Sequence, residues 1–352
     1  METIVMDMRE GVNLSQIRQA GEILKKGGLV AFPTETVYGL GGDALNPSAS
    51  EKIYAAKGRP SDNPLIVHIA DMEHLAPIVT HRPDEARALA DAFWPGPLTI
   101  ILPKSDRVPL QTTGGLSTVA VRMPSHPVAL SLIRESGGYI AAPSANLSGH
   151  PSPTKASHVI HDLSGRIDAI IDGGDGDIGI ESTIIDLTED TPVILRPGFI
   201  SLEMARHILG DVKMDPGLLK DDPNLRPKAP GMKYRHYAPQ ADLKIVQGER
   251  GRVIAAICSL SEKAAGAGRK VGIIATDETR DSYLGIPGDP VIRSVGTRAE
   301  EISISRHLYG ILREFDDLGV DNIYSEAFDT PQIGQAVMNR LIKAAGHQIL
   351  DV

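Results

Sequence analysis

The sequence contains one cysteine, Cys258, and only 4% aromatic residues among its 352 positions. One cysteine cannot form an internal disulfide or a cysteine-rich zinc site, so both kinds of scaffold are excluded. Cys258 follows the apolar run 253–257, and we expect it to be a small buried hydrophobe rather than a nucleophile. Because aromatic residues are scarce, aliphatic side chains are expected to form the cores.

Long apolar segments are also missing. No stretch approaches the roughly 20 apolar residues that span a membrane. The first ten residues, METIVMDMRE, carry acidic residues early and lack the apolar core of a secretory signal. These features predict a cytoplasmic protein with no membrane partner.

Positive charge is not in excess, since 36 basic residues face 45 acidic ones for a net charge of −9. This balance argues against a broad basic face that grips nucleic acid non-specifically. The exception is 225–237, LRPKAPGMKYRHY, which follows the acidic stretch 211–224. A Pro-rich stretch in which the charge changes sharply from acidic to basic indicates an interdomain linker. A plain solvated connector is the alternative, but Tyr234, His236 and Tyr237 among the cations favour a functional role.

Several common catalytic motifs are absent. There is no G-x-x-x-x-G-K-[ST], so a P-loop would not hold ATP. The lack of H-E-x-x-H and G-x-S-x-G removes the common zinc hydrolase and serine hydrolase classes. The second half has no G-x-G-x-x-G after its first strand, so a Rossmann-like shape there would not imply a dinucleotide.

The length predicts two domains. Up to about residue 210, short apolar strands mix with amphipathic helices without strict alternation, which predicts an α/β domain on a twisted mixed sheet. Strands are expected at 29–32, 64–69, 98–102, 118–123, 139–142, 169–172, 182–187 and 193–195, and helices at 48–57, 84–93 and 127–134. Later, strands at 243–246, 271–275, 291–294 and 322–325 alternate with helices at 253–263, 298–316 and 332–345. That alternation predicts a smaller, parallel, Rossmann-like sheet.

Four cations stand at the ends of predicted elements: Lys57, Arg59, Arg122 and Arg196. Helix capping explains the first two equally well. The other two end apolar strands, and ligands of open α/β sheets gather outside strand ends. We therefore expect a polyanion such as a nucleoside triphosphate, with Arg59 and Arg196 at exposed positions.

The remaining polar candidates have ordinary structural explanations. His68, in an apolar strand, would by default be a core histidine, and Thr36, Ser144, Asn146, Ser152 and Ser182 would be turn or cap residues. The glycine-rich segment 172–180 is interpreted as a flexible loop that positions Ser182 and Thr183. Calcium is an alternative for its three aspartates, although no glutamate stands in the EF-hand register.

Four motifs carry a resemblance to a known family. They are Phe32-Pro33-Thr34-Glu35-Thr36-Val37-Tyr38-Gly39-Leu40-Gly41, Lys57-Gly58-Arg59-Pro60, Ser144-Ala145-Asn146 and the linker motif from Pro230 to Pro239. Together they resemble YrdC-like proteins, in the long two-domain form of the threonylcarbamoyl-AMP synthase family. The resemblance covers essentially the whole chain. It implies a YrdC-like catalytic domain at 1–210, a linker that acts as a lid at 211–241, and a Rossmann-like domain at 242–352.

The resemblance also assigns site residues. Positions around L-threonine would be Thr36, His68, Arg122, Ala142 and Ser182, with Arg122 on the carboxylate and Ala142 contributing its backbone. Positions that hold ATP would be Arg59, Asn63, Thr118, Ser144, Ser152 and Arg196, with Arg235 reaching back from the linker. Lys57 and Arg59 are the predicted catalytic cations.

The implied activity joins L-threonine, bicarbonate and ATP into threonylcarbamoyl-AMP and pyrophosphate, for the N6-threonylcarbamoyladenosine modification of tRNA. A tRNA-modifying complex would receive the product. Mg²⁺ is expected with the nucleotide, and no protein metal site is predicted. Two alternatives remain: a non-catalytic RNA-binding module, and a carbamoyltransferase that uses carbamoyl phosphate, as in hydrogenase maturation proteins.

Overall fold

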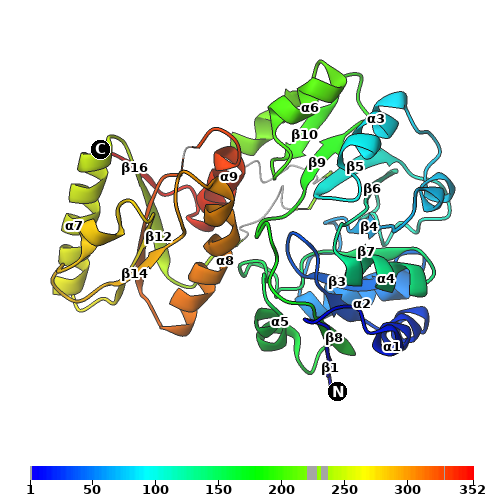
Figure 1. Ribbon diagram of the computed structural model, residues 1–352, viewed down its shortest axis with the longest axis horizontal. Helices are drawn as coiled ribbons and strands as arrows, with labels where there is room; N and C mark the ends of the chain where they lie inside the picture. Colours follow the sequence, from blue (N-terminus) through cyan, green and yellow to red (C-terminus); the bar gives the residue numbers. More distant parts are fainter. Residues whose placement is uncertain (1, 220–227, 231–236, 329) are drawn as a thin grey trace. The chain divides into compact units, whose positions relative to one another are not determined.

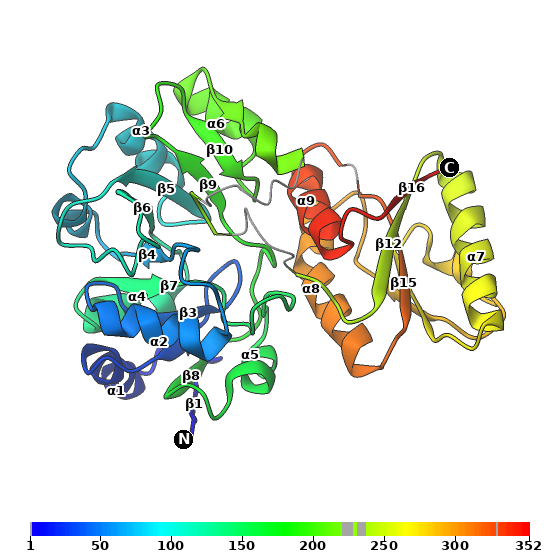
Figure 2. The ribbon, with the colours of Figure 1, turned by 180° about the vertical axis from the view of Figure 1, so that it is seen from behind.

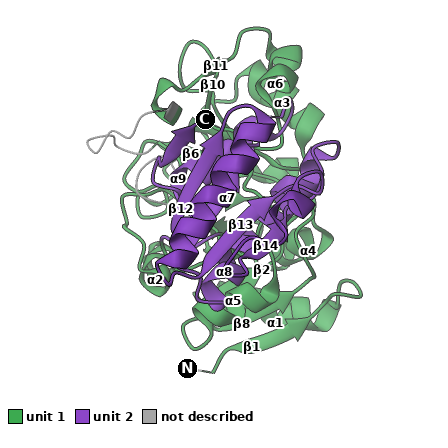
Figure 3. Ribbon diagram, turned by 90° about the vertical axis from the view of Figure 1, so that its left-hand side faces the viewer, with its two compact units in different colours: residues 1–148, 152–234 green, residues 149–151, 235–352 purple. Residues whose placement is uncertain are grey.

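A computed structural model describes residues 2–219, 228–230, 237–328 and 330–352. The chain forms two compact units, which Figure 3 colours separately. Unit 1 comprises 1–148 and 152–234, and unit 2 comprises 149–151 and 235–352. Two α/β units were expected from the sequence. The domain borders at residues 210 and 241 stay a prediction, because they concern which segments fold independently.

Unit 1 is built on one mixed sheet, in the order β1-β8-β2-β3-β7-β4-β6-β5-β9-β10-β11. Its strands are β1 (Ile4–Asp7), β2 (Val30–Phe32), β3 (Gly39–Asp43), β4 (Ile66–His68), β5 (Leu98–Pro103), β6 (Thr118–Arg122), β7 (Ile140–Ala142), β8 (Ala169–Asp172), β9 (Thr183–Asp186), β10 (Val193–Arg196) and β11 (Lys213–Met214). Parallel and antiparallel pairs both occur, as in β4–β6 and β5–β6. The predicted twisted mixed sheet is confirmed.

Helices cover this sheet in two groups. They are α1 (Leu14–Lys25), α2 (Pro47–Lys57), α3 (Asp84–Phe93), α4 (Pro127–Glu135), α5 (Ala156–Leu163) and α6 (Leu202–Leu209). Figures 1 and 2 show α1, α2 and α4 beside β3 and β7, and α3 and α6 beside β5, β9 and β10. Aliphatic side chains dominate the cores between these layers, as the scarcity of aromatic residues suggested. Among the described residues, no helix is both long and apolar enough to cross a membrane.

Local sequence signals explain where α2 begins and ends. The side chain of Asn46 accepts a hydrogen bond from the backbone N–H of Ser48, and Pro47 occupies the first turn, where its missing N–H costs nothing. The helix ends at Gly58, whose φ of 63° is a left-handed conformation that glycine adopts freely. This stop fixes Lys57 on the last turn and Arg59 just outside the helix.

The sequence predicted some elements with their bounds and missed others. Helix α3 and strand β8 have the predicted bounds. Strand β3, GLGGD, was missed because glycine has poor strand propensity. Close packing favours glycine at position 41, because an added Cβ atom would lie 2.8 Å from Cγ2 of Ile140. Also missed were β1, β11, β16 (Ile349–Asp351) and the helices α1, α5 and α6, which are short or lie near unit ends.

Unit 2 is a parallel sheet in the order β14-β13-β15-β12-β16, which confirms the predicted parallel, Rossmann-like arrangement. Its elements are β12 (Asp242–Gln247), α7 (Arg250–Gly266), β13 (Val271–Ala275), β14 (Val291–Ser294), α8 (Glu301–Asp317), β15 (Asn322–Glu326), α9 (Gly334–Ala344) and β16 (Ile349–Asp351). Figures 1 and 2 show α7 on one face of the sheet and α8 and α9 on the other. Cys258 is half-buried against the core beneath α7, and this burial raises the pKa of its thiol.

Candidate active site

Strand register places three of the predicted site residues, His68, Thr118 and Arg122, on one face of the unit 1 sheet. Arg122 ends β6 directly opposite His68 on β4 and Thr99 on β5. Residues paired across strands point to the same face, as do residues two apart along one strand. Thr118 and Arg122 therefore share this face with Ala120 between them. The apolar residues Ile66, Ala120 and Ile184 form its floor.

The sheet curls around this face. Strands β2 and β4 are separated by β3 and β7, a distance of about 14 Å at the usual spacing between strands. Yet the rings of Phe32 and His68 meet edge to face, with centroids 6.0 Å apart. Glu35, just after β2, reaches Arg122 on β6. The site face is therefore concave, and distant strands contribute to one site.

Arg122 lies at the centre of this concave face and is held by a buried acid. Its Nη2 lies 2.6 Å from Oε1 of Glu35, and both side chains are under a tenth exposed. The other carboxylate oxygen of Glu35 accepts from the backbone N–H of Ser125, at 3.2 Å. The Nε of Arg122 is buried and has no hydrogen-bond partner among the described residues. A fixed guanidinium with an unused buried donor suits the carboxylate of a ligand.

His68 is neutral in this environment. Burial, reinforced by the positive charge of Arg122, lowers its pKa from 6.5 to about 3. Its Nδ1 lies 3.1 Å from the carbonyl oxygen of Ile66. We assign the proton to Nδ1, which donates to that carbonyl, so Nε2 is left as an acceptor.

Ser182 joins this group through two neighbours. Its Oγ lies 2.8 Å from Oγ1 of Thr99, and Arg196 donates to the same Oγ at 3.1 Å and to the Ser182 carbonyl at 3.0 Å. Arg196 is only 6% exposed, so the expectation of an exposed position was wrong. The antiparallel pairing of β10 with β9 turns this strand end inward, where Arg196 lies opposite Ile184.

Lys57 and Arg59 both donate hydrogen bonds to backbone carbonyl oxygens. Lys57 is buried, and its ammonium donates to the carbonyl oxygens of Ser144, at 2.5 Å, and Asn146. Its contacts make Lys57 an anchor for the loop that carries Ser144. Arg59 is half-buried and donates to the carbonyl oxygen of Pro64 at 3.3 Å. Its place after α2 and before β4 matches the prediction.

Other members of the predicted ATP set lie nearby in the fold. Because β4 runs parallel to β6 with Ile66 opposite Ala120, residues just before β4 lie at the Thr118 end of the face. Asn63 is buried there, and neither its amide nitrogen nor its oxygen has a partner among the described residues. Such orphaned polar atoms need a ligand or water to be satisfied. Ser152 is buried and donates to Oε1 of Glu181.

Thr36 and Ala142 lie where the β2–β3 and β7 segments meet. Thr36 is fully buried, with its hydroxyl oxygen 2.8 Å from that of Thr34. Ala142 lies opposite Ile66 across the β4–β7 pair, so its backbone borders the same face. The glycine-rich loop packs here, since the N–H of Gly179 donates to the Thr36 carbonyl oxygen. Within the described part of the chain, no three His, Cys, Asp or Glu residues cluster as a metal site.

The described parts of the linker contact the rest of the chain on both sides of 231–236. On the N-terminal side, Ala229 packs into the apolar floor of the concave face, and the carbonyl oxygen of Pro230 accepts a hydrogen bond from Nη1 of Arg196 at 3.3 Å. On the C-terminal side, the ring of Tyr237 stacks on Tyr309 of α8, with centroids 5.3 Å apart. Arg235, which the resemblance places on ATP, lies outside the described residues, as do 220–227 and 231–236.

Three buried partners were not predicted from the sequence: Glu35, Thr99 and Glu181. Each holds a predicted site residue, namely Arg122, Ser182 and Ser152. Glu35 and Glu181 are carboxylates next to predicted site residues in the sequence, and Thr99 interrupts an apolar strand. These signals were present, but their partners are far away along the chain.

Two family models match this chain. One, of the Sua5, YciO and YrdC proteins, is described as "Telomere recombination" and matches residues 22–198, and the other, described as "Threonylcarbamoyl-AMP synthase, C-terminal domain", matches residues 200–346. The threonylcarbamoyl-AMP synthase of Bacillus subtilis is 50% identical over 96% of this chain and 95% of its own length. That of Pyrococcus abyssi is 49% identical over 99% of this chain and its own full length. The crystal structure of P. abyssi Sua5 complexed with L-threonine superposes with a TM-score of 0.93 at 48% identity, covering 99% of this chain and all of that one.

Proposed function

The chain belongs to the threonylcarbamoyl-AMP synthase family and is an enzyme of the nucleotidyltransferase type, and we propose that it makes threonylcarbamoyl-AMP and pyrophosphate from L-threonine, bicarbonate and ATP. The product would supply the N6-threonylcarbamoyladenosine modification of tRNA through a downstream tRNA-modifying complex. The observation that carries this proposal is the buried Arg122, with its unpaired Nε, on the same concave face as His68 and Ser182.

Threonine is proposed to bind over this face. Its carboxylate would pair with Arg122, whose guanidinium Glu35 already holds in place. Neutral His68 offers an acceptor for the amino acid's amine or hydroxyl, and Ser182 offers a hydroxyl. Thr36 and the backbone of Ala142 would close the pocket around the methyl group. The relative from P. abyssi, whose structure is complexed with L-threonine, supports this choice of substrate.

ATP is proposed to bind next to threonine, at the Thr118 end of the face. Arg59 and Arg196 would neutralise phosphate charge, and the orphaned amide of Asn63 would bind the nucleotide. Lys57 would act by holding the loop of Ser144 in position. Remaining contacts would come from Ser152, steadied by Glu181, and from Arg235 in the linker.

The chemistry needs positioning more than an enzymic nucleophile. The threonine amine and bicarbonate give a carbamate with loss of one water molecule, and a carbamate oxygen then attacks the α-phosphate of ATP and displaces pyrophosphate. Negative charge develops on the phosphates, and fixed cations stabilise it. Mg²⁺ bound to ATP would add charge neutralisation, carried by phosphate oxygens rather than by a protein site.

The linker is proposed to act as a lid over this site. Ala229 and Pro230 already cover part of the face, and Pro230 is bonded to the proposed phosphate ligand Arg196. Tyr237 fixes the far end in unit 2. A lid that excludes water protects carbamates and mixed anhydrides, which hydrolyse readily.

Pyrophosphate release from ATP, measured with and without L-threonine and bicarbonate, tests the function. Release that depends on both co-substrates is expected. Equal ATP turnover with both omitted would reject the synthase proposal. Detection of threonylcarbamoyl-AMP by mass spectrometry in the complete mixture is the matching product assay.

A further inference from the structure

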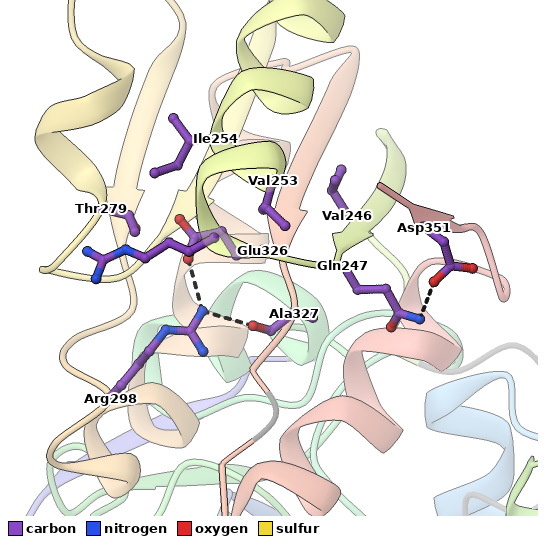
Figure 4. A pocket seen from close by; sticks show the side chains of 11 residues that line it. Val246, Gln247, Val253, Ile254, Thr279, Arg298, Glu326, Ala327 and Asp351 are labelled. Atoms are coloured by element: carbon purple, nitrogen blue, oxygen red, sulfur yellow. Dashed lines mark hydrogen bonds and ion pairs between the residues drawn. The ribbon is translucent and has the colours of Figure 1, made fainter.

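Unit 2 contains a cavity that the proposed synthesis does not use. Its volume is about 590 Å³, and it opens at the carboxyl ends of β12 and β15 (Figure 4). Small-molecule sites commonly have volumes of about 300–1,000 Å³. The cavity is therefore large enough for a ligand of mononucleotide size.

Sheet topology explains why a crevice opens here. Strands β12 and β15 are parallel neighbours. The chain leaves β12 for α7 on one face of the sheet and leaves β15 for α9 on the other, as Figures 1 and 2 show. Connections that depart to opposite faces leave a gap between them, and open α/β sheets bind ligands at such points.

Two arginines bring positive charge to this cavity. Nη2 of Arg298 donates to the carbonyl oxygen of Ala327, at 2.9 Å, and to a carboxylate oxygen of the buried Glu326, at 3.0 Å. Tyr283 donates to the other oxygen of Glu326, at 2.8 Å, so the acid is fully engaged. Figure 4 shows the Arg298 guanidinium turned toward this pair. The ion pair thus fixes the orientation of Arg298.

Both arginines keep donors for a ligand. In the part of the chain that the structure describes, Nε and Nη1 of Arg298 have no hydrogen-bond acceptor. Arg250 is exposed and gives one hydrogen bond, from Nη2 to the carbonyl oxygen of Glu278. Two guanidiniums with unused N–H groups that line one cavity suit a carboxylate or phosphate group.

Besides Glu326, the lining has one further acid, Asp351, whose carboxylate accepts a hydrogen bond from Nε2 of Gln247 at 2.7 Å, and apart from the two arginines the remaining lining residues are apolar or neutral. Val246 and Val253 are buried and Ile254 is half-buried, and all three line the cavity. The N-terminus of α7 does not provide the anion site, because the Glu249 side chain already accepts from the backbone N–H of Arg252. Charge recognition therefore falls to the two arginines, and the valine wall suits an apolar or ring-shaped body.

We propose that this cavity binds a small organic anion of up to mononucleotide size, with its phosphate or carboxylate on Arg250 and Arg298 and its apolar part against Val253 and Ile254. Nothing in the synthesis of threonylcarbamoyl-AMP requires this site. The proposal therefore stands or falls separately from the proposed function.

Methyl NMR of the full chain, with labelled isoleucine and valine, tests the site directly. AMP and benzoate serve as phosphate and carboxylate probes, and adenosine lacks the anion. Saturable shifts of the Val246, Val253 and Ile254 methyl signals are expected with AMP, benzoate or both, and weaker ones with adenosine. Binding of AMP in unit 1 is distinguished because it shifts the methyls of Ile66 and Ile184 instead. No saturable shift with either anion up to about 10 mM, the weak end of measurable affinity, would overturn the proposal.

Two matched variants test the role of charge. Arg250→Gln should weaken binding about tenfold, the effect of losing one charge-assisted hydrogen bond. Arg252→Gln removes the same charge two residues along α7, at an exposed position outside the lining, and should leave affinity unchanged. Equal affinities for the two variants would contradict anion recognition. The same conclusion would follow if adenosine bound as tightly as AMP and benzoate did not bind.

Discussion

Glu35 and Arg122 are 87 positions apart in the chain, yet their side chains form an ion pair with a 2.6 Å separation in the concave face of unit 1. The acid follows β2 and the base ends β6. Their pairing orients the one guanidinium proposed to take the threonine carboxylate. Glu35 is thereby a positioning residue for substrate binding.

Replacing Glu35 with glutamine should raise the KM for threonine about tenfold or more, by loss of a charge-assisted hydrogen bond. Glutamine has one carbonyl oxygen for two donors, the Arg122 guanidinium and the Ser125 N–H. The KM for ATP should change much less. Steady-state kinetics at varied threonine measures the effect.

The matched control is Asp71→Asn, which removes the carboxylate of the exposed Asp71–Arg134 pair, at 2.8 Å. Exposed pairs contribute about 0–1 kcal/mol, so kinetics and stability should barely change. If Glu35→Gln lowered the melting temperature but left the KM for threonine unchanged, Glu35 would be a structural residue only.

The lowered pKa of His68 predicts a stability loss in acid. The unfolded chain binds a proton at this histidine near pH 6.5, while the folded chain binds it only near pH 3. Between these values the unfolded state holds more protons, so stability falls as the pH falls. From pH 6.5 to about pH 5, this histidine should contribute a loss of about 1–2 kcal/mol to the free energy of unfolding.

Urea denaturation of wild type and His68→Gln at both pH values measures this contribution. The glutamine variant cannot titrate, so its unfolding free energy should fall less over the interval. His81→Gln, at an exposed position, is the control and should keep the wild-type pH dependence. Identical pH dependence in wild type and His68→Gln would show that His68 is not the group responsible.

The two proposed phosphate cations should behave differently on removal. Arg59→Ala should weaken ATP binding by about 1.5–3 kcal/mol with little loss of stability, because Arg59 is half-buried. Arg196→Ala should weaken ATP binding and also destabilise the fold, since this buried residue bonds Ser182 and Pro230. Calorimetric titration with ATP and thermal melts separate the two effects.

Arg87→Ala provides the comparison for both variants, since Arg87 is exposed and pairs only loosely with Asp91, at 3.6 Å. It should match wild type in both assays. Unchanged ATP affinity in Arg59→Ala would remove Arg59 from the proposed nucleotide site.

Amino-acid selectivity should follow the fit around the threonine methyl group. Serine lacks this methyl, and losing one in a fitted pocket costs about 1–3 kcal/mol. The ratio of kcat/KM for threonine over serine, from pyrophosphate release, measures this. Equal values would place the methyl outside any pocket.

The lid proposal predicts that ligands protect the linker. Trypsin cleavage between Arg226 and Arg235 should slow when ATP and threonine are both present, because a closed lid is less accessible.

Arg235→Ala should lose much of the activity, whereas Arg226→Ala removes a cation from the same segment and should lose little. A chain ending at Leu209 should remain folded with badly reduced synthesis. Unchanged cleavage with ligands, together with full activity of the shortened chain, would refute the lid.

The sequence by itself determined many of the elements of both units and several of their ends. Apolar runs of five or six residues predicted β5 and β6, and Gly58 predicted the end of α2, because periodicity and capping act over neighbouring residues. The same local signals located Arg59 and Arg122 beside element termini, and the motif spacing led to the family.

Only the tertiary structure decided what surrounds those residues. The curl that brings Phe32 to His68, the carboxylate of Glu35 on Arg122 and the burial of Arg196 all depend on contacts between strands far apart in the sequence. Strand order and register decide which residues make such contacts. A single sequence does not give the strand order or the register, because both depend on side-chain contacts between strands that are far apart along the chain. The cavity of unit 2 has the same origin, since it exists only where β12 and β15 lie side by side.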